Sequence, residues 1–540
     1  MSASRLGTIA LALLFGAALW LRVSSLGAIP WHDGDESYEG VELARMLQGQ
    51  RFTLFTTNGN LMDPFFLAMQ APFQLIAKPS LSVLRAPAAV SGVLAVVFAL
   101  VLGARVLDVP TATTAAVLLA TLPAAVVYSR IGYEYCQIPL VGVVVIYFAL
   151  KGDVRGLTLA LLAALLVHPI NVFLVPIVAP IFLTPLLRKK AGDYEQPRKV
   201  LWASAAMIAG LALVIWFIGR RPVARANFAA RPTMDWSTFL FSVEKFYLFQ
   251  YHKNNAATLL IQRWVFRGVT AAVSGIGLWQ LTRDRHWERL SVVGGLLLGL
   301  VSFHFLTGPL KLASLPEHRY GVVFLAPAAF AFACLAQGLF AGRVIREASL
   351  AALGGALLFT AWSNGLAPMQ ARSRESLWTF RVEVKDPFEQ ALTLIFRDLI
   401  QNPGGRDPWE PCVVVGQDFW IAKPLEYLAS WNRRIEVELL VTPEEARWDI
   451  RDPKIETRVK KRREQLIARL RAGAYAVGPL HASELNWANL IEETIASSFR
   501  PEQVEQWMVA NAQGDIALVV YRLKAEATVE VAEKASDPPT

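Results

Sequence analysis

The residues with the clearest capacity for chemistry lie in an acidic segment, Trp31–Glu39, which directly follows the apolar run Ile9–Leu26. Within seven residues this segment places four carboxylates: Asp33, Asp35, Glu36 and Glu39. Ionisable groups beside lipid cost free energy unless they have a function, so we interpret this segment as part of an active site at the membrane–water boundary. Capping of the next helix is the alternative, because Asp suits the N-cap and Glu suits the first turn. The two interpretations are compatible.

The composition of the 540-residue chain is that of a membrane protein, with 54% hydrophobic and 18% charged residues and a mean hydropathy of +0.38. A transmembrane helix needs about 20 predominantly apolar residues. This criterion predicts a polytopic α-helical protein with about eleven crossings. The predicted spans are 7–27, 83–107, 111–129, 136–150, 157–167, 170–187, 200–218, 264–281, 289–307, 320–341 and 347–368.

The distribution of lysine and arginine predicts the orientation of these spans. With the N-terminus in the cytoplasm, every predicted inner loop is basic, whereas the acidic segment and everything after residue 369 fall outside. We therefore expect an integral, multi-pass protein of the plasma (inner) membrane, with membrane lipids as partners. No nucleic-acid partner is expected, since no basic stretch is interleaved with aromatic residues on a soluble face.

The chain is expected to have three regions. Residues 1–370 form the transmembrane part with an outer loop at 28–80, residues 371–524 form a soluble extracytoplasmic domain, and the charged residues 525–540 form a disordered tail. In the soluble domain, expected strands alternate with expected helices, which predicts an α/β fold. The strands are 412–416, 435–441, 475–477 and 516–521, and the helices are 421–431, 456–472 and 482–495.

Further polar residues stand at the outer ends of predicted spans. Glu134 lies in a short loop and is spaced to pair with Arg130 as an i, i+4 partner, so simple pairing is an equal alternative to a catalytic role. His168 interrupts an apolar region, where a histidine is more often a satisfied helix-end residue than a ligand. Cys136, Cys334 and Cys412 are too far apart to indicate a metal site or a disulfide.

Cationic residues on the outer side are candidates for binding phosphate, which guanidinium groups bind well. The loop 219–263 opens with a cluster that breaks the positive-inside pattern: Arg220, Arg221, Arg225 and Arg231. Pairing with Asp235, Glu244 or lipid headgroups is the alternative for this cluster. Three more cations stand at the outer mouth of the predicted bundle: Lys311, His318 and Arg319.

Several of these segments resemble one family. Gly34–Tyr38, Glu42–Gly49 and the aromatic helix that begins at Asp63-Pro64 resemble the first outer loop of type C glycosyltransferases, in the branch of protein O-mannosyltransferases and lipid A aminoarabinose transferases. Tyr128–Glu134 and Pro316–Tyr320 resemble two later outer segments of the same branch. The resemblance covers roughly residues 1–370, in the right order and on the predicted outer face.

The resemblance implies a bundle of transmembrane helices with two surface helices in the first outer loop, and a sugar donor carried on a polyprenyl phosphate. By position, Asp35 matches the family's catalytic carboxylate and Glu134 its second acidic position, which in relatives orients the acceptor or a metal. One departure is Asp63, which replaces a lysine of the aminoarabinose transferase branch. An anion there cannot hold a donor phosphate, so binding of a sugar hydroxyl or a cation is expected instead.

The resemblance, together with the residues above, implies an inverting glycosyltransferase that moves a sugar from a polyprenyl phosphate to a hydroxyl of a lipid, glycan or protein. We expect Asp35 to be the general base, Glu36 or Glu134 to position the acceptor, and Asp63, Tyr38 and His168 to contact acceptor or sugar. The expected phosphate contacts are Arg319, His318, Arg221, Arg225 and Lys311. No cofactor is certain; a divalent metal, if used, is expected at Asp35 and Glu134. A transporter or flippase, and a membrane-anchored binding protein that acts through its C-terminal domain, are the alternatives.

Overall fold

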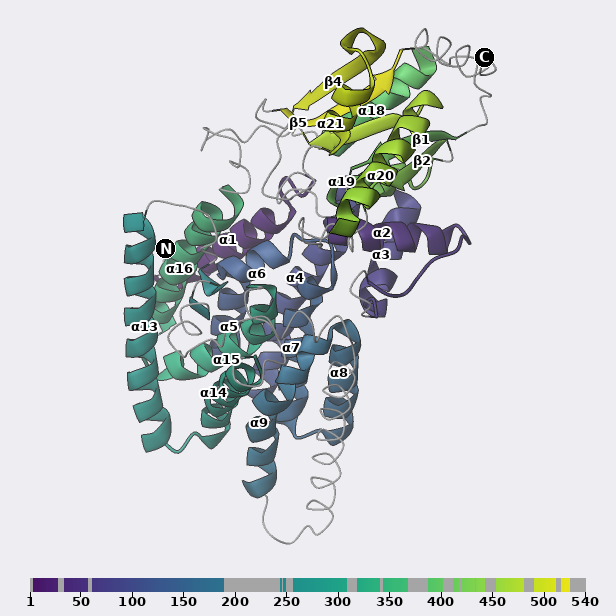
Figure 1. Cartoon of the computed structure of the whole chain (residues 1–540). Helices are drawn as coiled ribbons and strands as arrows, with labels where there is room; N and C mark the ends of the chain where they lie inside the picture. The colour runs from purple at the N-terminus through teal and green to yellow at the C-terminus, as the bar shows by residue number, and fades with distance from the viewer. Residues whose placement is uncertain are drawn as a thin grey trace, which may run out of the picture. The chain divides into compact units, whose positions relative to one another are not determined.

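The structure is a computed structural model, and it describes the greater part of the chain (Figure 1). The described residues are 3–27, 34–56, 61–188, 243–244, 246–248, 256–307, 318–339, 343–367, 387–401, 411–417, 419–432, 434–441, 453–479, 490–510 and 516–524. Contacts divide the chain into two compact units. The first unit comprises residues 1–24, 58–68 and 85–369, and the second comprises 25–57, 69–84 and 370–540. Each unit is described below by itself.

The first unit is a bundle of apolar helices. Its α-helices are α1 (Ala3–Val23), most of α4 (Leu81–Val106), α5 (Val109–Thr121), α6 (Pro123–Tyr128), α7 (Ile138–Lys151), α8 (Val154–Val167), α9 (Leu174–Arg188), α13 (Ala256–Arg283), α14 (Trp287–Thr307), α15 (Leu325–Ala336) and α16 (Arg343–Thr360). Short 3-10 helices precede three of them: η1 (Glu134–Gln137), η2 (Pro169–Phe173) and η3 (His318–Phe324). Among the described residues, five helices are long and apolar enough to cross a membrane. The protein is therefore a multi-pass membrane protein.

The predicted spans agree with these helices. Each predicted span within the described residues coincides with one helix or with two or three consecutive helices, because apolar runs of this length are stable in lipid only when helical. The predicted span 200–218 lies outside the described residues. The structure does not test the total of about eleven crossings that the hydropathy rule predicts.

One aspartate ties together three helices of the bundle. Asp108 is the N-cap of α5, and its Oδ1 accepts a hydrogen bond from the backbone N of Thr111 at 2.8 Å. Its Oδ2 accepts from Arg289 at 2.5 Å and from Gln337 Nε2 at 2.9 Å, so residues of α14 and of the turn after α15 meet at the start of α5. The cap also explains the tight turn between α4 and α5, where Pro110 occupies the first turn.

The second unit contains a five-stranded mixed sheet in the order β2-β1-β3-β5-β4. The strands are β1 (Cys412–Gly416), β2 (Ile435–Leu439), β3 (Tyr475–Pro479), β4 (Val504–Ala510) and β5 (Ile516–Leu523). β1 pairs in parallel with β2 and β3, whereas β5 is antiparallel to both β3 and β4. The predicted α/β class is confirmed, and the sheet is mixed.

Helices cover both faces of this sheet. One core packs α18 (Pro387–Gln401) and α19 (Phe419–Ala429) against residues such as Val414 and Val477. The other core packs α20 (Pro453–Arg471) and α21 (Leu490–Ser498) against residues such as Ala476 and Val519. Sequence analysis missed α18 and β4. The second unit also includes α2 (Gly34–Leu47) and the end of α3 (Pro64–Ile76), the two helices of the first outer loop.

Candidate active site

Asp35, the expected general base, is the second residue of α2. Its side chain lies outside the described part of the structure. The first-turn position places its backbone in the positive field of a helix N-terminus, which favours a charged carboxylate. Three residues later, the hydroxyl of Tyr38 donates to the backbone O of Phe55 at 3.2 Å. The Nζ atom of Lys423 lies 5.4 Å from the centre of the Tyr38 ring.

Glu36, the neighbouring acid, lies in the interior of the second unit. Its exposed fraction is 0%, as is that of Ser37. Burial raises the pKa of the Tyr427 hydroxyl, and the nearby Glu36 carboxylate raises it further, which places Glu36 beside α19. Of the two acids that the sequence offers for positioning the acceptor, Glu36 and Glu134, Glu36 is therefore fully enclosed by protein.

Asp63 is buried at the start of α3, with an exposed fraction of 1%. Its Oδ1 accepts from the backbone N of Phe65 at 2.8 Å, which makes it the cap of that helix. The side-chain amide of Gln137 bridges Asp63 and the backbone of α3. Its nitrogen donates to Asp63 Oδ2 at 3.1 Å, and its oxygen accepts from Phe66 N at 3.2 Å. In this orientation each donor meets an acceptor. Asp63 thus joins α3 to the 3-10 helix η1.

Burial raises the pKa of Asp63 to about 8, against the opposing effect of the backbone N–H groups of Phe65 and Phe66. The Glu134 carboxylate contributes to the same upward shift of the pKa. At neutral pH the Asp63 carboxyl therefore carries its proton most of the time. A neutral carboxyl can hydrogen-bond a sugar hydroxyl as donor or acceptor, and it does not repel an anionic donor as a carboxylate would.

Glu134 and His168 face each other across the start of two 3-10 helices. The Oε1 atom of Glu134 lies 3.9 Å from His168 Nε2. His168 Nδ1 accepts from the backbone N of Ile170 at 3.0 Å, so the neutral ring carries its proton on Nε2, on the side of Glu134. The Tyr135 ring packs on the His168 ring at a centroid distance of 4.7 Å. His168 is thus both the expected helix-end residue and a neighbour of the expected site acid.

Arg130, the i, i+4 neighbour of Glu134 in the sequence, lies in the interior of the first unit. It is 1% exposed, and its guanidinium donates to the backbone O of Leu21 and to that of Ser24, the latter at 2.7 Å. Arg22 is also buried and donates to the backbone O atoms of Leu119 and Ala120 at 2.8 and 2.7 Å. Each arginine therefore binds the carbonyl groups at the end of a neighbouring helix.

Burial, together with smaller contributions from the nearby Arg85 and Arg22 guanidinium groups, lowers the pKa of Arg130 to about 9. Three buried guanidinium groups thus lie close together in the first unit. Sequence analysis missed Arg22 and Arg85 as members of this group. The available signal was that both interrupt the predicted spans 7–27 and 83–107.

The expected phosphate contacts cannot be placed. Arg221, Arg225 and Lys311 lie outside the described residues. His318 and Arg319 begin the 3-10 helix η3, but their side chains lie outside the described part of the structure. Glu244, an alternative partner for the outer arginine cluster, accepts from Arg267 Nη2 at 2.7 Å. Among the described side chains, which do not include that of Asp35, no three of His, Cys, Asp or Glu come together as a metal site.

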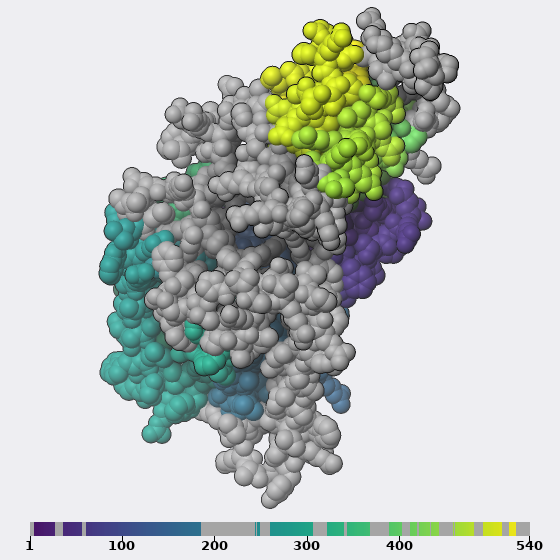
Figure 2. Space-filling view, viewed as in Figure 1, coloured from purple at the N-terminus to yellow at the C-terminus, as the bar shows by residue number. Residues whose placement is uncertain are grey.

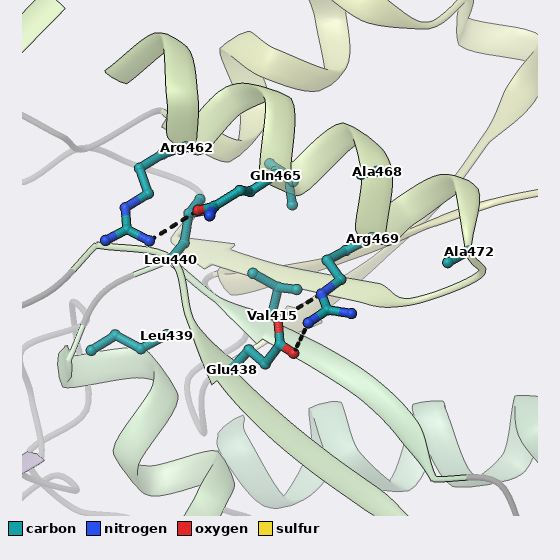
Figure 3. Close-up of a pocket in the computed structure, with 10 residues that line it drawn as sticks. Val415, Glu438, Leu439, Leu440, Arg462, Gln465, Ala468, Arg469 and Ala472 are labelled. Atoms are coloured by element: carbon teal, nitrogen blue, oxygen red, sulfur yellow. Dashed lines mark hydrogen bonds and ion pairs between the residues drawn. The ribbon is translucent and has the colours of Figure 1, made fainter. Parts of the chain in front are cut away.

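A separate groove of about 480 Å³ lies in the C-terminal domain, between α20 and the edge strand β2 (Figure 3). Two arginines of α20 line it, and both are engaged by neighbouring side chains. Arg469 Nε donates to Glu438 at 2.8 Å, and Arg462 Nη1 donates to Gln465 Oε1 at 2.9 Å. The contact of Arg469 with Glu438 therefore links α20 to the edge strand β2 across the groove.

The fold resembles that of two solved structures of ArnT from Cupriavidus metallidurans. The structure bound to undecaprenyl phosphate gives a TM-score of 0.52 at 12% sequence identity, with 94% of this chain and 97% of ArnT covered. The apo structure gives 0.51 at 12% identity, with 97% and 99% covered. An oligosaccharyltransferase from Archaeoglobus fulgidus with Zn and sulfate gives 0.49 at 13% identity, with 87% of this chain and 68% of that protein covered.

No known family model and no curated protein sequence matches the chain. The resemblance to type C glycosyltransferases, which the sequence indicated for roughly residues 1–370, is confirmed at the level of fold and extends over most of the chain.

Proposed function

We propose that this protein is an inverting glycosyltransferase that transfers a sugar from a polyprenyl phosphate to a hydroxyl group. The observation that carries the proposal is the ArnT-like fold, which spans 94% of this chain and 97% of a protein solved with undecaprenyl phosphate. The position of Asp35 at the start of the first helix of the outer loop supports it. The sugar and the class of acceptor, whether lipid, glycan or protein, are open.

The proposed reaction is a single displacement. The Asp35 carboxylate takes the proton of the acceptor hydroxyl as its oxygen forms a bond to the anomeric carbon. The bond from that carbon to the phosphate oxygen breaks, and the electron pair leaves with the polyprenyl phosphate. Inversion follows because attack and departure occur on opposite faces. A general base of this kind contributes about 10²- to 10⁴-fold in rate.

The remaining residues have supporting roles in the proposal. Glu134 positions the acceptor, held in orientation by His168, and the neutral Asp63 carboxyl binds a sugar hydroxyl with its capping contacts fixed. Positive charge for the leaving phosphate comes from Arg319, His318, Arg221, Arg225 and Lys311. A divalent metal at Asp35 and Glu134 stays a prediction, as does an extracytoplasmic site on the plasma (inner) membrane.

The test is transfer of a radiolabelled sugar from polyprenyl phosphate by the purified protein and by Asp35→Asn. We expect Asp35→Asn to lose at least about 100-fold in kcat, because the amide cannot accept the proton, while the donor Kd stays within about threefold. Asp33→Asn removes a charge from the same segment and is the matched control, with activity within about tenfold of wild type. Near-normal turnover by Asp35→Asn would remove Asp35 from the role of base. Flux of the lipid across vesicles without transfer would support a flippase instead.

A further inference from the structure

Helix α19 of the C-terminal domain is covered on two sides. On one side Ile421, Leu425 and Ala429 belong to the core that packs against the sheet. On the other side Tyr427 belongs to a different cluster, with Val41 of α2 and with Leu81 and Leu84 at the start of α4. In an α/β domain with helices on both faces of the sheet, the outer side of such a helix ordinarily faces water. Here that side is buried against the helix that carries Asp35 (Figure 1).

The contact between α19 and α2 is close. Tyr427 is 0% exposed, and a Cβ atom added to Gly40 would lie 2.7 Å from atoms of the Tyr427 ring. Gly40 therefore lets the ring lie directly on the backbone of α2, five residues after Asp35. The Tyr427 hydroxyl donates to the backbone O of Ser80 at 3.4 Å. Figure 2 shows the purple surface of the first outer loop directly adjoining the green surface of the C-terminal domain.

Charged side chains reinforce the same contact. Glu426 of α19 accepts from Arg45 of α2, and it also pairs with Lys423 at 2.5 Å. Lys423 in turn lies over the ring of Tyr38, one turn from Asp35. At the far end of α2, Gln48 Nε2 donates to the backbone O of Ser430 at 2.8 Å. Polar contacts thus extend along α2 on both sides of the Tyr427 ring.

We propose that the C-terminal domain is the positioning element of the catalytic helix, with Tyr427 and Glu426 as the residues through which α19 fixes Asp35. The inference rests on the proposed function for its kinetic consequence, but its structural content is independent of the reaction. A helix is a stiff rod with a rise of about 1.5 Å per residue, so a shift at Gly40 reaches Asp35 undamped. A misplacement of about 1 Å at a catalytic group can cost about 100-fold in rate.

The experiment compares three single variants of the full-length protein. Tyr427→Ala removes the ring, whereas Tyr427→Phe keeps the ring and removes the hydroxyl that contacts Ser80. Tyr521→Ala is the matched control, because Tyr521 is a buried tyrosine of the same domain that packs in the core with α20 and α21. Three quantities are measured: the hydrogen exchange of the α2 amides, the kcat for sugar transfer and the Kd of the donor.

We expect Tyr427→Ala to speed exchange in α2 about tenfold or more and to lower kcat by about 10- to 100-fold. Its donor Kd is expected to stay within about threefold of wild type. Tyr427→Phe should restore both exchange and kcat to within about threefold, and Tyr521→Ala should leave exchange in α2 unchanged. Equal exchange in α2 for Tyr427→Ala and Tyr521→Ala overturns the proposal.

Two further variants guard against a domain that fails to fold. Gly40→Ala disturbs the contact from the α2 side while favouring the helix itself, and it should reproduce the loss of kcat. Arg45→Met breaks the pair with Glu426, and Arg463→Met, which breaks the pair with Glu493, is its control. Unchanged kcat and α2 exchange in both Gly40→Ala and Arg45→Met contradict the proposal. If wild type transfers no sugar, the proposed function fails while the exchange measurements still decide the inference.

Discussion

Asp63 is a buried acid whose charge is determined by the groups around it. Its carboxyl caps α3 and meets the Gln137 amide, yet burial raises its pKa to about 8. An ionised aspartate in that place would lie beside the Glu134 carboxylate, so protonation relieves both burial and repulsion. We expect the protein to contain a neutral carboxylic acid there at physiological pH.

This protonation predicts a dependence of stability on pH. In the unfolded chain the Asp63 pKa returns to about 3.9, so between about pH 4 and pH 8 only the folded state holds the proton. The free energy of unfolding therefore falls as pH rises through this window. Asp63→Asn keeps a good helix cap and does not titrate. We expect its Tm in detergent to exceed that of wild type by about 4 °C or more at pH 9 and by much less at pH 5.

Asp153 supplies the control for that measurement. It caps α8 in the same way, accepting from Gly156 N at 3.0 Å, but that hydrogen bond lowers its pKa. Asp153→Asn should therefore show no gain in Tm at alkaline pH. Parallel Tm curves for wild type and Asp63→Asn from pH 5 to pH 9 would show that the Asp63 carboxyl is ionised throughout.

The sequence identified Asp63 but not its environment. The Asp-Pro pair indicates a helix start at 63–64 with no knowledge of the rest of the fold. Its partner Gln137 is more than seventy positions away in the chain, and no local pattern reveals which distant amide completes a buried cap. For the same reason the sequence did not reveal that Arg130 binds carbonyl groups at the end of α1.

At the scale of elements, α9 and α14 pack through glycine. A Cβ atom on Gly295 would lie 2.1 Å from the backbone O of Ile177, and one on Gly299 would lie 2.3 Å from the Ile177 side chain. The two glycines are four residues apart and face the same neighbour. Small residues at this spacing allow close approach of membrane helices, where van der Waals contact replaces the hydrophobic effect as the source of association.

Adjacent glycines in α14 allow a matched test of this packing. Gly295→Ala should destabilise the protein by about 1–3 kcal/mol, because either the helices separate or the Ile177 carbonyl moves. Gly294→Ala introduces the same methyl group one residue away, where nothing lies within 4 Å. It should be neutral or stabilising by up to about 1 kcal/mol, since alanine favours a helix. Equal Tm changes in the two variants would contradict the close contact between α9 and α14.

Hydropathy predicted the membrane helices well because one local property, apolar length, decides whether a segment can cross lipid. The strand β4 was missed for a related reason. Its residues 504–510 include Glu505, Gln506 and Trp507 and do not form the apolar run that marked β1 and β3. As the edge of the sheet it pairs only with β5, so it carries polar residues that a central strand would exclude.

At the scale of the whole molecule, the units do not follow the order of the chain. Residues 25–57 and 69–84 of the first outer loop belong with the C-terminal domain, through contacts such as that between Tyr427 and Gly40. Sequence analysis placed that loop with residues 1–370, because hydropathy ranks segments by their affinity for lipid. It carries no information about which soluble element covers a surface helix. The side of the membrane on which this shared unit lies is therefore a decisive property of the proposed enzyme.

Cysteine labelling can measure that side. The native residues Cys136, Cys334 and Cys412 are buried, so they give a low background. Asp284 and Glu502 are exposed, and the three predicted spans 289–307, 320–341 and 347–368 lie between them. Three crossings are an odd number, so the two positions must lie on opposite sides. In right-side-out vesicles an impermeant maleimide should label Glu502→Cys at once and Asp284→Cys only after the membrane is opened. Labelling of both positions from one side would refute the predicted crossings. Labelling of Asp284→Cys alone would show that the orientation is opposite to the predicted one.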